Sequence, residues 1–228
     1  DVLIPQQWIE EAQERWLQFQ GREPISQEPR MLGVDVAGMG RDATCYVERK
    51  GAWVSVFDCH NSGGAAEHMA VAGQIIARRR RHPEMYASID TIGEGAGVYS
   101  RCIEVDKPQQ IISCKYSEWG GYDPAKLTDI TGQHHFVNMR AYLFWCVRDW
   151  LNPKNGTGAM LPPDARFIEE ATEIRWFFRS DGKIQIEPKE DIKKRLGRSP
   201  DRFDALANTF YPLSRHKVID LERLKRLV

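Results

Sequence analysis

The spacing of apolar and polar residues changes several times in the first half of the chain, and each change predicts an element. Apolar residues at helical intervals between 5 and 20 predict a helix, and the polar stretch GREPISQEPR predicts a linker after it. Short apolar runs at 31–37, 44–50 and 52–59 are typical of strands, and we expect them to form an antiparallel meander.

The remaining segments predict helices alternating with strands. The predicted helices lie at 64–82, 98–105 and 136–151, and the predicted strands lie at 85–90 and 109–114. Two strand-like runs at 174–186 meet at Asp181–Gly182, which favours a β-hairpin. Ser199 as N-cap and Pro200 as first residue predict a late helix, and 215–228 reads as a helical tail. The pattern therefore predicts an α/β fold with a mixed sheet of five strands, flanked by helices.

Aspartates occupy corresponding places in this plan. Asp35 and Asp90 each end an apolar strand, while Asp204 lies on the late helix with Asp201 one turn earlier. Carboxylate oxygens are the ligands that Mg²⁺ and Mn²⁺ prefer, so the pattern indicates a divalent-metal site. Three of these residues also have an ordinary interpretation. Asp35 can cap a turn, Asp204 can be a surface residue, and Asp201 is favoured by the helix dipole.

Charge gives only local support for a nucleic-acid partner. Lysine plus arginine number 32 and aspartate plus glutamate number 32, so the chain has no overall basic field. A basic run leads directly into the helix of Asp201 and Asp204. Its candidate contacts to DNA phosphates are Lys193, Lys194, Arg195 and Arg198.

Cysteine usage and hydropathy predict the compartment. The five cysteines are odd in number, dispersed and without CxxC spacing, which is typical of reduced thiols in a cytosol. The sequence shows neither an apolar run of membrane-spanning length nor the pattern of a signal peptide. We therefore expect an intracellular protein without a membrane partner.

The order of these features resembles a known family. An aspartate in the first strand, a meander, a second strand aspartate and a third on a late helix look like the ribonuclease H-like fold. Within it, the chain resembles the C-terminal nuclease domain of the large terminase subunit of tailed bacteriophages. The matching segments are GVDVAGMGRDAT, DTIGEGAGV, NMRAYLFWCVRDWL and SPDRFDALANTF, with LIPQQWIEEAQ resembling the segment that leaves the family's ATPase domain.

The resemblance implies an endonuclease that cuts concatemeric double-stranded viral DNA with little sequence preference during packaging. Asp35, Asp90 and Asp204 would be its catalytic metal ligands for two ions of Mg²⁺ or Mn²⁺. Some relatives have a histidine where this chain has Asp201, which leaves Asp201 open as ligand or helper.

The resemblance also divides the chain and implies partners. Residues 1–30 would be a helix and linker from an ATPase domain, 31–214 the nuclease domain, and 215–228 a helical tail. The chain contains no Walker A sequence of the form GxxxxGKS/T, so that ATPase domain is expected to lie outside it. By family, the partners are DNA, the portal, the small terminase subunit and the ATPase domain, in the host bacterial cytoplasm.

Other interpretations stay open at this point. A junction resolvase or transposase shares the metal aspartates but gives structure-specific or strand-transfer products. An actin-like ATPase also opens with a phosphate-binding strand, but it normally needs two such domains, and the chain has room for one. A catalytically silent DNA-binding or protein-binding module with this fold would have lost metal binding.

Overall fold

The strands of the protein form one mixed sheet and one separate hairpin. The computed structural model describes residues 1–38, 42–61 and 67–213. The strands are β1 (Arg30–Asp35), β2 (Ala43–Lys50), β3 (Trp53–Val54), β4 (Asp58–Asn61), β5 (Tyr86–Asp90), β6 (Ile111–Cys114), β7 (Trp176–Phe178) and β8 (Ile184–Ile186). The sheet order is β3-β2-β1-β5-β6, with β4 also paired to β2, while β7 and β8 form a separate two-stranded sheet. Strand β1 runs antiparallel to β2 and parallel to β5, which makes the sheet mixed.

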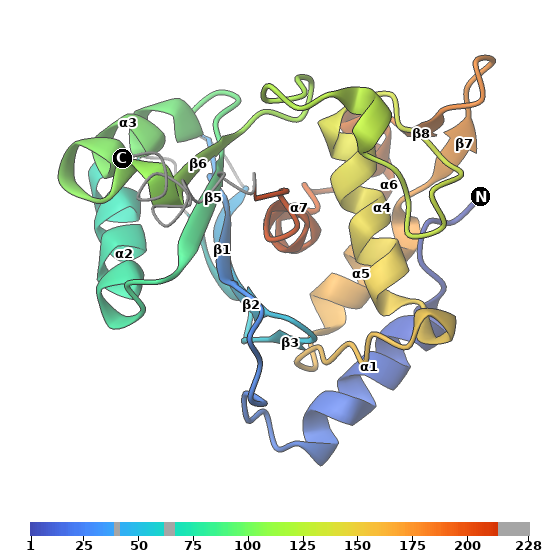
Figure 1. The fold of residues 1–228 in the computed structure, drawn as a ribbon, viewed down its shortest axis with the longest axis horizontal. Helices are drawn as coiled ribbons and strands as arrows, with labels where there is room; N and C mark the ends of the chain where they lie inside the picture. Colours follow the sequence, from blue (N-terminus) through green and yellow to red (C-terminus); the bar gives the residue numbers. More distant parts are fainter. Residues whose placement is uncertain (39–41, 62–66, 214–228) are drawn as a thin grey trace, which may run out of the picture.

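Helices cover both faces of this sheet. They are α1 (Gln6–Gln18), α2 (His68–Arg81), α3 (Gly95–Val105), α4 (Met139–Leu151), α5 (Ala165–Glu173), α6 (Lys189–Leu196) and α7 (Asp201–Asn208). Figure 1 shows α2 and α3 on one side of the sheet and α7 on the other, between the sheet and α4. Helix α7 also contacts α5, so it is enclosed by the sheet and two helices. In the described part of the chain, no helix combines the length and the apolar character needed to cross a membrane.

The two faces of the sheet differ in composition because side chains alternate along a strand. On the α2 and α3 side, Leu32 and Val34 of β1 join Ala87 and Ile89 of β5 in an apolar cluster. The residues between them face α7 instead, and they are small or polar. This second face can therefore receive a helix at close range and can hold carboxylates.

The predicted α/β fold with a mixed sheet and a late hairpin is confirmed, but the strand count is wrong. The structure has six sheet strands instead of five, because the predicted strand at 52–59 is divided into β3 and β4. Val54 pairs with Arg49 and Asp58 pairs with Tyr46. Three residues therefore stand opposite two, which is the arrangement of a β-bulge.

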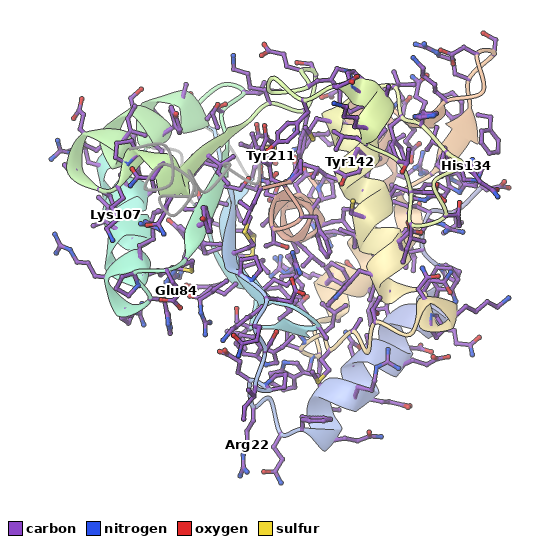
Figure 2. The ribbon with its side chains drawn as sticks, in the orientation of Figure 1. Arg22, Glu84, Lys107, His134, Tyr142 and Tyr211 are labelled. Atoms are coloured by element: carbon purple, nitrogen blue, oxygen red, sulfur yellow. A yellow bond between two sulfur atoms is a disulfide. The ribbon has the colours of Figure 1, made fainter. Side chains whose placement is uncertain are left out.

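The prediction that all cysteines are reduced is also wrong. Cys45 and Cys59 are direct partners across β2 and β4, and they form a disulfide that Figure 2 draws as a yellow bond. The register brings the two side chains together, and sequence spacing gives no sign of it. Cys102, Cys114 and Cys146 are free thiols.

Local predictions for the later helices were partly wrong. Helix α7 begins at Asp201, its N-cap position is Pro200, and Ser199 Oγ makes no hydrogen bond with any described residue. Helices α5 and α6 were not predicted. The predicted tail at 215–228 lies outside the described residues.

Candidate metal centre

The first two predicted aspartates lie at the carboxyl ends of neighbouring parallel strands. Val34 of β1 and Ile89 of β5 are register partners, and Asp35 and Asp90 are the next residues on the two strands. Strand alternation turns both side chains toward α7. Asp35 is 6% exposed. The carboxyl edge of parallel strands is the usual ligand-binding edge of an open α/β sheet.

Helix α7 lies directly on β1 because Gly33 has no side chain. A Cβ at Gly33 would lie 1.9 Å from the carbonyl oxygen of Ala205, so only glycine allows this approach. Asn208 Nδ2 donates to the carbonyl oxygen of Val34 at 2.9 Å, which fixes the helix against the strand. Asp204, one position before Ala205, is thereby held against the strands that carry Asp35 and Asp90.

Asp204 is fully buried and has one close cation. Its Oδ2 lies 2.6 Å from Lys189 Nζ, and its side chain is 0% exposed. Its Oδ1 has no hydrogen-bond partner among the described residues. The hydroxyl of Tyr116 donates to the Asp204 carbonyl oxygen at 3.1 Å, which helps to fix the backbone of this residue. A buried carboxylate oxygen without a donor is costly, and a cation would remove that cost.

Asp201 and Asp90 each have one oxygen engaged by the backbone. Asp201 Oδ2 accepts a hydrogen bond from Ala43 N at 2.8 Å, which joins α7 to the start of β2. Asp90 Oδ1 accepts from Ile92 N at 2.9 Å, in the turn after β5. We call Asp35, Asp90, Asp201 and Asp204 the acidic centre. Asp201 lies in the first turn of α7, as its ordinary interpretation expects, and it also makes a backbone contact that the sequence did not indicate.

Burial and the neighbouring carboxyl groups raise the pKa values of three aspartates of the acidic centre. Burial raises the pKa of the Asp35 carboxyl well above its usual value, against the lowering effect of Lys189, and the other three aspartates raise it further. Burial also raises the pKa of Asp90 and that of Asp201, each to about 6. Carboxylates with raised pKa values, gathered at a strand edge, are typical of a functional site.

The donor chemistry of the acidic centre fits a hard divalent cation. All four side chains offer carboxylate oxygens, and Asp204 Oδ1 is buried with neither a hydrogen bond nor an ion pair to a described residue. As they stand, no three acidic, histidine or cysteine side chains in the described ranges are arranged to hold a metal ion. One oxygen of Asp90, Asp201 and Asp204 already has a backbone or ammonium partner, so the side chains would have to reorient around an ion.

Sequence reasoning missed Lys189, the cation of this centre. It is the first residue of α6 and follows Pro188, at the end of the segment that continues from β8. Arg140 of α4 holds this segment, since its Nη1 donates to the carbonyl oxygen of Glu187 at 2.6 Å. The only signal in the sequence is a single lysine within the acidic stretch EPKED, which gives no indication of its partner.

The four predicted DNA-binding residues all have acidic partners. Lys193 Nζ lies 3.3 Å from Asp42 Oδ2, and Lys194 Nζ lies 3.1 Å from Asp191 Oδ1. Arg195 pairs with Glu173 and Glu187, while Arg198 Nη2 lies 2.7 Å from Glu169 Oε2. We call these four residues, together with the turn between them, the basic segment. It lies beside the centre in sequence, but its charges are already paired.

Comparison with known proteins finds similarity only at the level of structure. No protein-family model matches the chain, and no curated protein matches it. The nuclease domain of the large terminase subunit gp2 of bacterial virus Sf6 is 20% identical, with 93% of this chain and 100% of that chain covered and a TM-score of 0.71. A lysine-to-alanine mutant of that domain with manganese and beta-thujaplicinol gives the same identity, coverage and TM-score.

A second phage protein has a more distant likeness. The large terminase nuclease from thermophilic phage G20c is 12% identical, with 81% of this chain and 82% of that chain covered and a TM-score of 0.51. These structural neighbours are nuclease domains of phage large terminases, and this chain has their ribonuclease H-like fold. The fold expected from the sequence is thus confirmed.

Proposed function

We propose that the chain is a metal-dependent endonuclease that cuts concatemeric double-stranded viral DNA, with little sequence preference, during genome packaging. The acidic centre is the observation that supports this proposal. Its carboxylates lie together at the carboxyl edge of parallel strands, and Lys189 forms an ion pair with one of them, Asp204. The fold that holds them is shared with terminase nuclease domains. Structural neighbours that were solved with manganese or calcium are consistent with a divalent cation.

Under this proposal Asp35, Asp90 and Asp204 are the ligands of two Mg²⁺ or Mn²⁺ ions and the catalytic residues. Such ions activate water and stabilise the departing oxygen of a phosphodiester. Burial raises the pKa of Asp35, and three neighbouring aspartates raise it further, so a cation nearby would favour its ionised form. Asp201 fixes α7 to Ala43 through Oδ2, and its second oxygen is a further candidate ligand. Lys189 neutralises Asp204 when no ion is bound.

The wider role follows the same proposal. Residues 1–30 would lead from an ATPase domain of the same polypeptide, 31–214 would form the nuclease domain, and 215–228 would be a tail. The partners would be DNA, the portal and the small terminase subunit, in the host bacterial cytoplasm. Lys193, Lys194, Arg195 and Arg198 would contact DNA phosphates, once freed from their acidic partners.

A plasmid-cutting experiment tests the nuclease proposal. Supercoiled plasmid is incubated with the purified chain in Mn²⁺, Mg²⁺ or EDTA, beside the variants Asp35→Asn, Asp90→Asn and Asp204→Asn. We expect cutting in Mn²⁺ or Mg²⁺ only, and a loss of at least about 100-fold in each variant, because each removes a charged metal ligand without changing side-chain size. The matched control is Asp123→Asn, at an exposed turn where asparagine can keep the hydrogen bond to Ala125 N.

The possible results separate the alternatives. A folded wild-type chain that neither cuts nor binds metal would indicate a silent binding module. Cleavage confined to branched DNA, or joined products, would indicate a resolvase or a transposase. Cutting that persists in all three asparagine variants would contradict the assigned site, and the control shows whether a lost aspartate charge alone changes the rate.

A further inference from the structure

Helix α7 has no cap of its own, although it carries two residues of the acidic centre. The N-cap position is Pro200, whose side chain cannot accept a hydrogen bond, and Ser199 Oγ makes none with the described residues. The carboxylate of Asp201 is directed to Ala43 N rather than to its own helix. The first N–H groups of a helix lack internal partners, so they need acceptors from elsewhere.

Glu170 of α5 supplies such an acceptor. Its Oε2 accepts a hydrogen bond from Phe203 N at 3.0 Å, at the third residue of α7. The Glu170 side chain is only 1% exposed. Phe203 directly precedes Asp204, so this hydrogen bond is made one residue from the buried metal ligand.

Among the described residues, the Phe203 N–H is a closer polar partner of the Glu170 carboxyl group than either neighbouring arginine. Its Oε1 lies 3.9 Å from Arg198 Nε and 3.9 Å from Arg202 Nη1, beyond hydrogen-bond distance. Burial raises the pKa of Glu170 to about 8, against the lowering effects of the Phe203 N–H and Arg202. A buried acid is costly to keep. The two arginines have closer acidic partners in Glu169 and Asp164. The hydrogen bond from Phe203 N is therefore the contact that gives the buried Glu170 carboxyl group a role.

The other end of α7 is held by an independent set of contacts. Arg49 of β2 donates through Nε to Thr209 Oγ1 and through Nη2 to the Thr209 carbonyl oxygen, both at 2.9 Å. Asn208 Nδ2 donates a hydrogen bond to the carbonyl oxygen of Val34 in β1. Loss of Glu170 should therefore loosen the first turn of α7, where Asp201 and Asp204 lie, while the last turn stays fixed to the sheet.

We propose that Glu170 is a positioning residue of the metal centre, which caps α7 from outside and fixes the place of Asp204. This inference rests on the proposed function and names a further residue on which that function depends. Glu170 itself touches none of the proposed ions or substrate groups. Its action passes through the Phe203 N–H to the neighbouring ligand.

Amide hydrogen exchange and Mn²⁺ titration of the same variants test this proposal. In Glu170→Ala, we expect the Phe203 amide to exchange at least about 10-fold faster, while amides of β1 and of the last turn of α7 keep their rates. We also expect the Mn²⁺ concentration for half-saturation, measured by calorimetry, to rise by about 10-fold. Glu170→Gln keeps an acceptor oxygen, so it should stay within about threefold of wild type in both measurements.

Glu169→Ala is the matched control, because it removes the neighbouring but exposed glutamate of α5. It should change neither the Phe203 amide nor the Mn²⁺ titration. Unchanged exchange in Glu170→Ala would overturn the cap, whatever the protein does with DNA. Faster exchange with an unchanged Mn²⁺ titration would reduce Glu170 to a structural role and overturn the proposal. Failure of the wild-type chain to bind Mn²⁺ would instead remove the proposed function and this inference with it.

Discussion

The acidic centre and the basic segment differ in how many of their charges have an ion-pair partner. Among the described residues, the pair between Lys189 and Asp204 is the only ion pair that the four aspartates of the centre make. In the basic segment, Lys193, Lys194, Arg195 and Arg198 each have a carboxylate within ion-pair distance. Both groups were singled out in the sequence for a role with DNA.

The difference shows which charged groups cost free energy in the folded state. Carboxylates that are buried together disfavour their ionised forms, as the raised pKa values of Asp35, Asp90 and Asp201 reflect. Paired charges near the surface cost little and contribute little. Among the described residues, the acidic centre therefore has a cationic partner for only one of its four carboxylates, whereas the basic segment is balanced by residues of its own chain.

Among the changes that test this difference, removal of Lys189 should have the largest effect on stability and on Mn²⁺ affinity. In EDTA, Lys189→Ala should lower the free energy of unfolding by about 2–3 kcal/mol, because it leaves the buried Asp204 carboxylate without its cation. This value is at the low end for a broken buried pair, since the Lys189 side chain is 32% exposed. Mn²⁺ should bind about 10-fold more tightly, because the ammonium group no longer competes for Asp204. Urea denaturation and calorimetry measure the two effects.

Lys183→Ala is the matched control for Lys189→Ala. Lys183 is a half-exposed lysine of the hairpin whose Nζ lies 3.8 Å from Asp181 Oδ2. Its loss should leave both the stability and the Mn²⁺ affinity close to those of wild type. Equal Mn²⁺ affinity in wild type and Lys189→Ala would contradict competition between the lysine and the metal.

The pH dependence of stability should give a somewhat smaller effect. Because burial raises the folded pKa of Asp90 to about 6, the folded state keeps a proton between pH 4 and 6 that the unfolded state has lost. Stability in EDTA should therefore fall as pH rises through this window, by about 2 kcal/mol from this group. Asp90→Asn, which cannot ionise, should remove this part of the slope and be more stable than wild type at pH 7.

Saturating Mn²⁺ provides the internal comparison for this prediction. An ion that binds the ionised carboxylates should reverse the wild-type trend, so that stability rises with pH. Urea denaturation of wild type, Asp90→Asn and Asp123→Asn at each pH isolates the contribution of Asp90. If the wild-type curve were parallel to that of Asp90→Asn from pH 4 to 7, the pKa of Asp90 would not be raised in the folded state.

The sequence was informative where local patterns decide the structure. Apolar runs located the main strands, and the ends of two of them located Asp35 and Asp90, because parallel strands bring their carboxyl ends to one edge. The order of elements was sufficient to predict the ribonuclease H-like fold. The bulge between β3 and β4 was not predictable, since one extra residue in an apolar run leaves the run intact.

Contacts between distant segments could not be predicted from the sequence. Lys189 meets Asp204 across the turn from α6 to α7, and Glu170 meets Phe203 across 33 positions. Cys45 and Cys59 meet only because β4 pairs back on β2. Residue type alone made the basic segment resemble a phosphate-binding surface, whereas the partners of Lys193, Arg195 and Arg198 lie outside α6. Side-chain pairing, which decides the charge of both regions, is a property of the tertiary structure.

The smallest expected effect is a difference in stability between two single variants of the basic segment. The Lys194 side chain is 77% exposed, and its one ion pair with a described residue is with Asp191 one turn earlier, so Lys194→Ala should change stability by less than about 0.5 kcal/mol. Arg195 joins α6 to Glu173 of α5 and to Glu187, so Arg195→Ala should cost about 1–2 kcal/mol. Urea denaturation measures both values.

DNA binding should follow the opposite order. Because Lys194 is the most exposed cation of the segment, it can reach a phosphate at the least cost, and its loss should reduce the salt dependence of binding by about one ion. Titration of duplex DNA at several salt concentrations, in EDTA, measures this slope for each variant. A larger change in slope for Arg195→Ala, after correction for its folded fraction, would mean that DNA displaces Glu173 and Glu187. The basic segment would then exchange its acidic partners for phosphates, as the acidic centre would exchange Lys189 for a metal ion under the proposed function.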